Sequence, residues 1–109
     1  MLTVSEKIAW MMDTLRVLSS LSELPADEVD YQVYENLDAD VRAALCMDNL
    51  REIAQAELLS PKVVAEIEFI RDATVLLIDR RIPGADLTEH DEWRHVISRA
   101  KTALDSISK

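Results

Sequence analysis

The sequence predicts an all-α protein, a single compact bundle of four to five helices that spans residues 1–109. Apolar residues recur at steps of three and four along most of the chain, which is the period of helices that bury one side. The chain also contains one glycine and three prolines, too few for the frequent tight turns of an all-β protein. Apolar residues make up 49% of the chain and charged residues 30%, which is the composition of a globular domain.

The first helix is expected to start at about Val4 and to end before Pro25. Thr3 and Glu6 have the spacing of a capping box, which marks the start of a helix. Its apolar stripe consists of Val4, Ile8, Met11, Leu15 and Leu18, widened by Trp10, Val17 and Leu21. Because this stripe is wide, we expect the helix to be mostly buried.

Two further helices are predicted before residue 60. Asp27 can cap a short one that ends at about Leu37, and Asp38 can cap the next. The apolar positions are Val29, Val33 and Leu37 in the former, and Val41, Leu45, Leu50, Ile53 and Leu58 in the latter. The pattern leaves open whether these are two helices or one bent rod.

The sequence of the second half of the chain predicts two long helices. Ser60 followed by Pro61 is a strong helix start, and Arg80 and Arg81 suit the C-terminal end. The buried stripe of this helix is Val63, Val64, Ile67, Ile70, Thr74, Leu77 and Ile78. Residues 82–85 form a loop, after which Asp86 or Thr88 can cap the last helix. Its inner stripe is Trp93, Ile97, Ala100, Leu104 and Ile107, with Val96 beside them.

Composition also argues against several classes of protein. The longest apolar runs are far shorter than the roughly 20 residues that cross a bilayer, and no signal peptide is visible. Cys46 is the single cysteine, so an internal disulfide is impossible. We therefore expect a cytoplasmic protein. The net charge of −9 leaves no basic footprint for direct nucleic-acid binding.

The candidate metal and catalytic groups are few, and we expect no enzyme, metal or cofactor. Glu92 and His95 have the spacing of di-metal bundle ligands, but such sites need two of these motifs and two further glutamates. His90 and His95 do not share a helical face. Cys46 has no histidine at helical spacing and is expected in the core.

The acidic segment of residues 23–40 is the most unusual feature. It holds seven acidic residues, and no lysine or arginine occurs from residue 17 to 41. Charge of one sign destabilises a compact state through self-repulsion, whereas ordinary solvated helix faces mix the signs. Tyr31 and Tyr34 lie three residues apart within it, so they are neighbours on a helix surface.

Aromatic rings among carboxylates are suited to binding a basic protein, because the rings supply contact area and the acids supply steering. The expected partner-binding residues are Asp27, Glu28, Asp30, Tyr31, Tyr34 and Glu35. The same display could imitate a phosphate backbone and block a nucleic-acid-binding protein. In this physical logic, though in no shared motif, the chain is similar to the immunity proteins of bacteriocin nucleases.

The leading interpretation is a small acidic protein that inhibits or escorts a basic partner, such as a toxin or a nucleic-acid-binding protein. It would act as an immunity protein, an antitoxin, a phage-type inhibitor or a secretion chaperone. One alternative is a structural bundle that associates with itself. A further alternative is a dimeric metal-binding enzyme that uses Glu92 and His95. The simplest alternative for the acidic segment is that Asp27 and Asp38 cap helices and the other acids are solvated.

Overall fold

The computed structural model describes residues 2–81 and 90–108, and within them every regular element is helical. The chain forms α1 (Val4–Ser19), a 3-10 turn η1 (Leu21–Glu23), α2 (Ala26–Tyr31), a π-helical turn η2 (Gln32–Leu37) and α3 (Asp38–Ala44). It continues with α4 (Met47–Gln55), α5 (Pro61–Asp79) and α7 (Asp91–Ser108). The prediction of an all-α bundle is confirmed. None of the helices in the described ranges is both long and apolar enough to cross a membrane.

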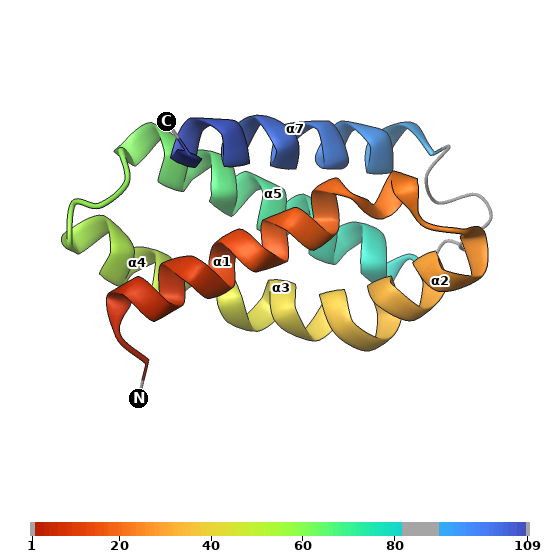
Figure 1. The fold of residues 1–109 in the computed structure, drawn as a ribbon, viewed down its shortest axis with the longest axis horizontal. Coiled ribbons are helices and arrows are strands. Elements are labelled where there is room, and N and C mark those ends of the chain that lie inside the picture. Colours follow the sequence, from red (N-terminus) through yellow and green to blue (C-terminus); the bar gives the residue numbers. More distant parts are fainter. Residues whose placement is uncertain (1, 82–89, 109) are drawn as a thin grey trace.

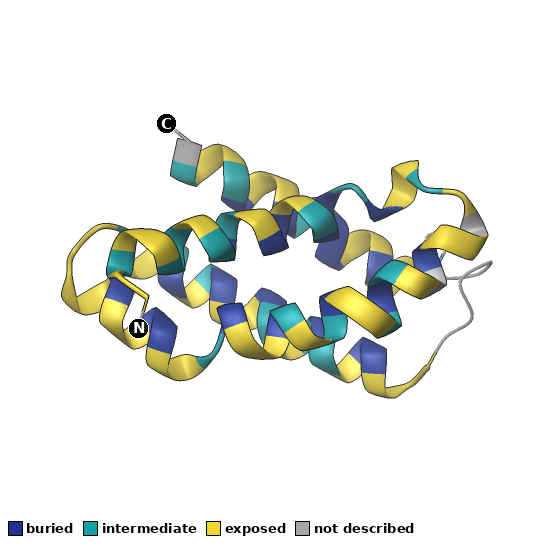
Figure 2. Ribbon diagram, turned by 60° about the horizontal axis from the view of Figure 1, so that its bottom comes forward, coloured by how far each residue is buried: buried dark blue, intermediate teal, exposed yellow. Residues whose placement is uncertain are grey.

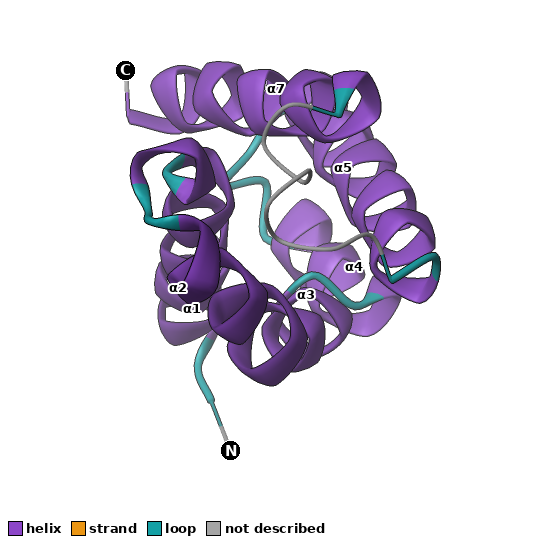
Figure 3. Ribbon diagram, turned by 90° about the vertical axis from the view of Figure 1, so that its right-hand side faces the viewer, coloured by secondary structure: helices purple, strands orange, loops and turns teal. Residues whose placement is uncertain are grey.

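The helices form a four-sided bundle around one core. α7 packs against both α1 and α5, and α3 also packs against both α1 and α5 (Figure 1). Viewed from the end, α1 and α5 therefore lie at opposite corners, with α7 on one side between them and α3 on the other (Figure 3). Each helix turns a dark buried stripe inward and an exposed stripe outward (Figure 2).

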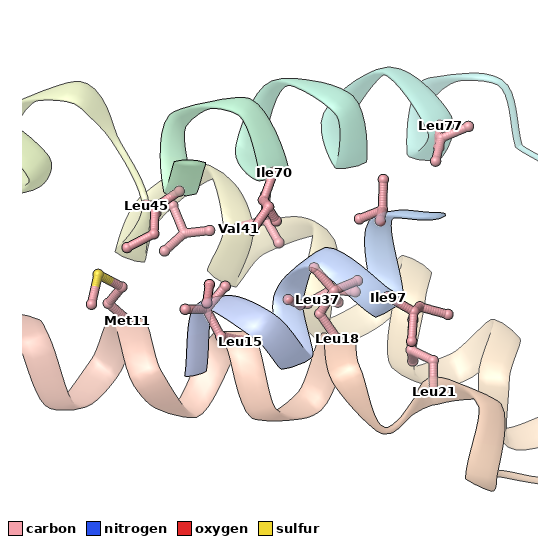
Figure 4. Close-up of a cluster of buried hydrophobic side chains, with 14 of the residues drawn as sticks. Met11, Leu15, Leu18, Leu21, Leu37, Val41, Leu45, Ile70, Leu77 and Ile97 are labelled. Carbon is pink, nitrogen blue, oxygen red and sulfur yellow. The ribbon is translucent and has the colours of Figure 1, made fainter. Parts of the chain in front are cut away.

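The buried cluster draws on every long helix, and its members were largely predicted from the apolar stripes. Met11, Leu15 and Leu18 of α1 are fully buried, and they belong to the same cluster as Ile70 of α5 and Ile97 of α7 (Figure 4). Trp93 is also fully buried. The caps predicted for Asp86 or Thr88 and the loop at 82–85 lie outside the described residues.

The helix starts at Thr3 and Ser60 are confirmed. The Thr3 hydroxyl accepts a hydrogen bond from the backbone of Glu6, and the Glu6 carboxylate accepts one from the backbone of Thr3. This hydrogen bonding to Thr3 also lowers the pKa of the Glu6 carboxyl. The Ser60 hydroxyl accepts a bond from the backbone of Val63, with Pro61 at the first helical position.

The caps predicted at Asp27 and Asp38 are wrong. α2 begins at Ala26, and the carbonyl of Pro25 accepts the first helical bonds from Glu28 and Val29 at 3.0 Å each. Asp27 therefore lies within the first turn. The residue before Asp38 is itself helical, so no helix starts there.

Of the two alternatives left open by the sequence, the structure has the single rod: residues 26–44 form α2, η2 and α3 without a break. The buried residues Val29, Val33, Leu37 and Val41 of the rod, together with Leu45 directly after it, recur every four positions, and each is at most 1% exposed. In a regular α-helix each step of four overshoots a full turn by about 40°, so the stripe would rotate by about 160° over this length. The wide turn of η2, where the Asp38 amide bonds to the Val33 carbonyl five residues back, reduces this rotation. The π-helical turn thus keeps a stripe with a period of four facing the core.

The rod ends at Leu45, so the predicted continuous helix from Asp38 to Leu58 is also wrong. The buried Asn49 side chain donates hydrogen bonds to the carbonyls of Ala43, at 3.1 Å, and Ala44, at 3.4 Å. Arg71 of α5 donates to the Leu45 carbonyl at 3.2 Å. These donors satisfy carbonyl groups that the end of a helix leaves unpaired, so the chain can turn here and begin α4.

Candidate partner-binding surface

The acidic residues at the start of the rod face solvent. Asp27 and Glu28 are exposed in the first turn of α2, and Glu35 is exposed in η2. Within the described part of the chain, no ion pair joins any of these three to a cation. Asp30 lies in α2, but its side chain is outside what the structure describes. The first part of the rod therefore presents uncompensated negative charge.

The two tyrosines differ in their environments. Tyr31 is 61% exposed, the same value as Leu76 on the outer side of α5. Tyr34 is partly buried and packs against the hydrophobic core. The sequence placed both rings on one surface, whereas the structure leaves Tyr31 as the ring that is mainly available to a partner.

One of the two acidic residues at the end of the rod, Asp38, is paired with a cation. Asp38 and Asp40 are partly buried, and the Asp38 carboxylate accepts a hydrogen bond from Arg42 Nε at 2.6 Å. Arg42 also donates from Nη2 to Asp79 of α5 at 2.7 Å, so it links the rod to α5. These two bonds raise the pKa of the Arg42 guanidinium. Among the described residues of the acidic segment, the exposed carboxylates without an ion pair therefore lie mainly in its first part, at Asp27, Glu28 and Glu35.

The candidate metal ligands Glu92 and His95 do not lie in a cluster with further metal-ligating side chains of the described residues. The Glu92 carboxylate accepts hydrogen bonds from Arg80 at 2.9 and 3.1 Å, and His95 is exposed. Over residues 2–81 and 90–108, no group of three or more metal-ligating side chains is placed to hold an ion. Cys46 is only partly buried, at the break between α3 and α4, so its predicted place in the core is corrected.

The ion pair between Arg99 and Glu66 was not predicted from the sequence. Arg99 of α7 donates two hydrogen bonds to the Glu66 carboxylate of α5, and its guanidinium lies 3.8 Å from the centroid of the Phe69 ring. The bonds from Arg99 lower the pKa of Glu66, against a smaller opposing effect of burial. Glu66 and Arg99 are 33 positions apart, so no local pattern could have revealed the pair.

These observations describe an exposed acidic surface at the start of the rod. Exposed carboxylates lie near one exposed aromatic ring on a helical rod that packs against α1 and α5. Such a surface offers contact area and charge complementarity to a cationic protein. Comparisons of the chain with protein-family models, with curated proteins and with solved structures found no match.

Proposed function

We propose that this chain binds a basic partner protein through the first part of its rod, residues 26–37. The observation that carries the proposal is Tyr31, a large aromatic side chain that is 61% exposed among exposed, unpaired carboxylates. Single exposed apolar groups are common on proteins, but a tyrosine within uncompensated charge of one sign is not explained by folding.

The two kinds of residue would act differently. Asp27, Glu28 and Glu35 would raise the rate of association, because exposed charges act through a long-range field. Tyr31 would enter a pocket of the partner and slow dissociation. The partner would be a cationic toxin or a nucleic-acid-binding protein, and the chain would inhibit or escort it.

The π-helical turn η2 is a second reason to place the binding surface in the first part of the rod. π-helical turns are uncommon and are found frequently at functional sites. Here η2 carries Glu35 and directly follows Tyr31, so the irregular backbone and the unpaired charge coincide. The turn also has a packing role, since it keeps Val33 and Leu37 buried.

The test is to capture partners from the native host on immobilised protein at low salt, with wild-type and variant chains in parallel. The captured protein is then purified, and its binding kinetics are measured over a range of salt concentrations. Tyr31→Ala should increase the dissociation rate by about 30-fold, which corresponds to a hot-spot loss of about 2 kcal/mol. Glu28→Lys should instead slow association and weaken its salt dependence.

Asp105→Lys is the matched control, because Asp105 is an exposed acid of α7, away from the rod. It changes the net charge by the same amount as Glu28→Lys. Equal effects of the two substitutions would mean that only the overall charge matters and that the rod is not the binding surface. Wild-type kinetics for Tyr31→Ala would remove the proposed anchor.

A further inference from the structure

A second surface, on the outer side of α5, is apolar. Leu76 is 61% exposed, Phe69 is 44% exposed, and Met47 at the start of α4 is 59% exposed. Phe69 and Leu76 lie on the side of α5 opposite its buried residues, with the partly buried Ala73 beside them. We call Phe69, Ala73, Leu76 and Met47 the α5 face.

Leu76 stands between two shallow grooves. One groove separates α5 from the start of α4, and its apolar lining includes Cys46, Met47 and Val75. The other lies between α5 and α7, and its apolar lining includes Phe69, Ala73 and Val96. The α5 face is therefore a ridge with a hollow on each side, which is the shape that helices use when they pack on one another.

The charges around the α5 face are balanced within the chain. Arg71 pairs with Asp72 at 2.9 Å, and Arg42 pairs with Asp79 at 2.7 Å. Across the second groove, Arg80 pairs with Glu92 at 2.9 Å. A strongly charged partner would find no electrostatic attraction here, in contrast to the start of the rod.

This balance favours another copy of the same chain. Each chain has a net charge of −9, so two copies repel one another in most orientations. Residues 1–59 carry twelve acids and four bases, which gives −8, whereas residues 60–109 carry nine acids and eight bases, which gives −1. Most of the α5 face belongs to this nearly neutral second half, and the acids Asp72, Asp79 and Glu92 beside it are paired, so two copies repel one another less there than at the unpaired acids of the rod.

We infer that the chain forms a dimer in which the α5 faces of two copies pack together about a two-fold axis near Ala73. Leu76 and Phe69 lie on either side of Ala73 along α5, so a two-fold axis near Ala73 brings Leu76 of one copy next to Phe69 of the other. In this antiparallel arrangement, Leu76 of each copy enters the groove beside Phe69 of the other. The small side chain of Ala73 allows the two helices to approach closely. Such an interface is self-complementary and closes at two copies.

The inferred dimer is independent of the proposed partner-binding function. A stable interface buries roughly 800 Å² per copy, about an eighth of the 6322 Å² accessible surface of the chain. The exposed acids of the rod lie outside the α5 face, so both copies could still bind a partner.

The experiment is sedimentation equilibrium of the purified chain from about 5 to about 500 µM, a range that spans weak dimer affinities. We expect the mass to rise from 12.4 kDa to twice that value and to stop there. Leu76→Glu should weaken the dimer by at least about 30-fold, because it would bury an unpaired charge in the interface. Leu58→Glu is the control: Leu58 is 54% exposed outside the α5 face, so this variant should dimerise like wild type.

Both substituted residues are exposed, so both variants should keep the wild-type circular dichroism spectrum. Higher salt should preserve or strengthen the dimer, because it screens the repulsion between acidic chains. A wild-type chain that stays monomeric over the whole range would overturn the inference. So would growth beyond two copies, or an unchanged dimer in Leu76→Glu.

Discussion

Replacing Leu37 by alanine should lower the free energy of unfolding by about 2–5 kcal/mol. The side chain is fully buried in the main cluster, and η2, which carries it, packs against α1. Loss of three carbon atoms accounts for about 2.4 kcal/mol, and the cavity left behind adds to this. For a chain of 109 residues, each kcal/mol corresponds to about 4 °C in Tm. A loss of about 3 kcal/mol would therefore lower the Tm by about 12 °C.

This substitution tests the wide turn of the rod. If residues 29–37 formed a regular α-helix, Leu37 would be rotated by about 80° from the direction of Val29, toward the edge of the buried side. Urea unfolding followed by circular dichroism measures the free energy for Leu37→Ala and for the control Asn36→Ala, whose side chain is exposed. The control should change stability by less than about 0.5 kcal/mol. Similar small losses for both variants would refute the description of the rod.

Three further predictions concern single contacts. Tyr34→Ala should lower the Tm clearly more than Tyr31→Ala, because only Tyr34 packs against the core; equal melting curves would contradict this. Ser60→Ala should cost about 1 kcal/mol in urea unfolding through loss of the cap of α5, and Ser60→Asp should restore most of it. The Glu66 pKa is lowered in the folded state, so its stabilising effect is present above the ordinary glutamate pKa of about 4.3 and is lost as the pH falls through the lower value. Glu66→Gln should therefore reduce stability at pH 7 more than at pH 2, and a pH-independent difference would rule out this linkage.

The features that the sequence predicted correctly are those determined by local spacing. The capping box at Thr3 and the start at Ser60 each depend on residues within three positions of one another. The stripes of α1, α5 and α7 follow the helical period, so the buried residues could be identified before their partners were known.

The errors arise where distant residues or wider geometry decide the structure. The end of the rod at Leu45 depends on Asn49 in the next helix and on Arg71 26 positions later. The join of the second and third helices, which the sequence pattern left open, had a visible signal. This is the strict spacing of four from Val29 to Leu45, which a regular helix cannot keep on one side. Caps are expected at Asp27 and Asp38 because aspartate is common at that position. However, α2 already begins at Ala26, and the residue before Asp38 is itself helical.

In the candidate site, Asp27, Glu28 and Glu35 are exposed without an ion pair to a described cation, whereas the sequence could not separate the two tyrosines. Tyr31 and Tyr34 differ by about 300° around a helix, so they are neighbours on its surface, and their exposure depends on how the rod sits against α1. That packing angle is a property of the whole bundle.

The wide turn of η2 also determines which changes in chain length the rod can accept. Removing one exposed residue there, such as Asn36, would let residues 29–44 form a regular α-helix. Each residue of a regular helix turns the chain by about 100°, so deleting one residue would rotate all later residues back by that angle. This would cancel most of the roughly 160° by which the buried stripe would otherwise rotate between Val29 and Leu45. Val29 and Val41 would then still face the same core. A one-residue deletion in α5, which has no such turn, would rotate half of its apolar stripe away from the bundle. The rod can thus lose one residue with less damage to the fold than α5 can.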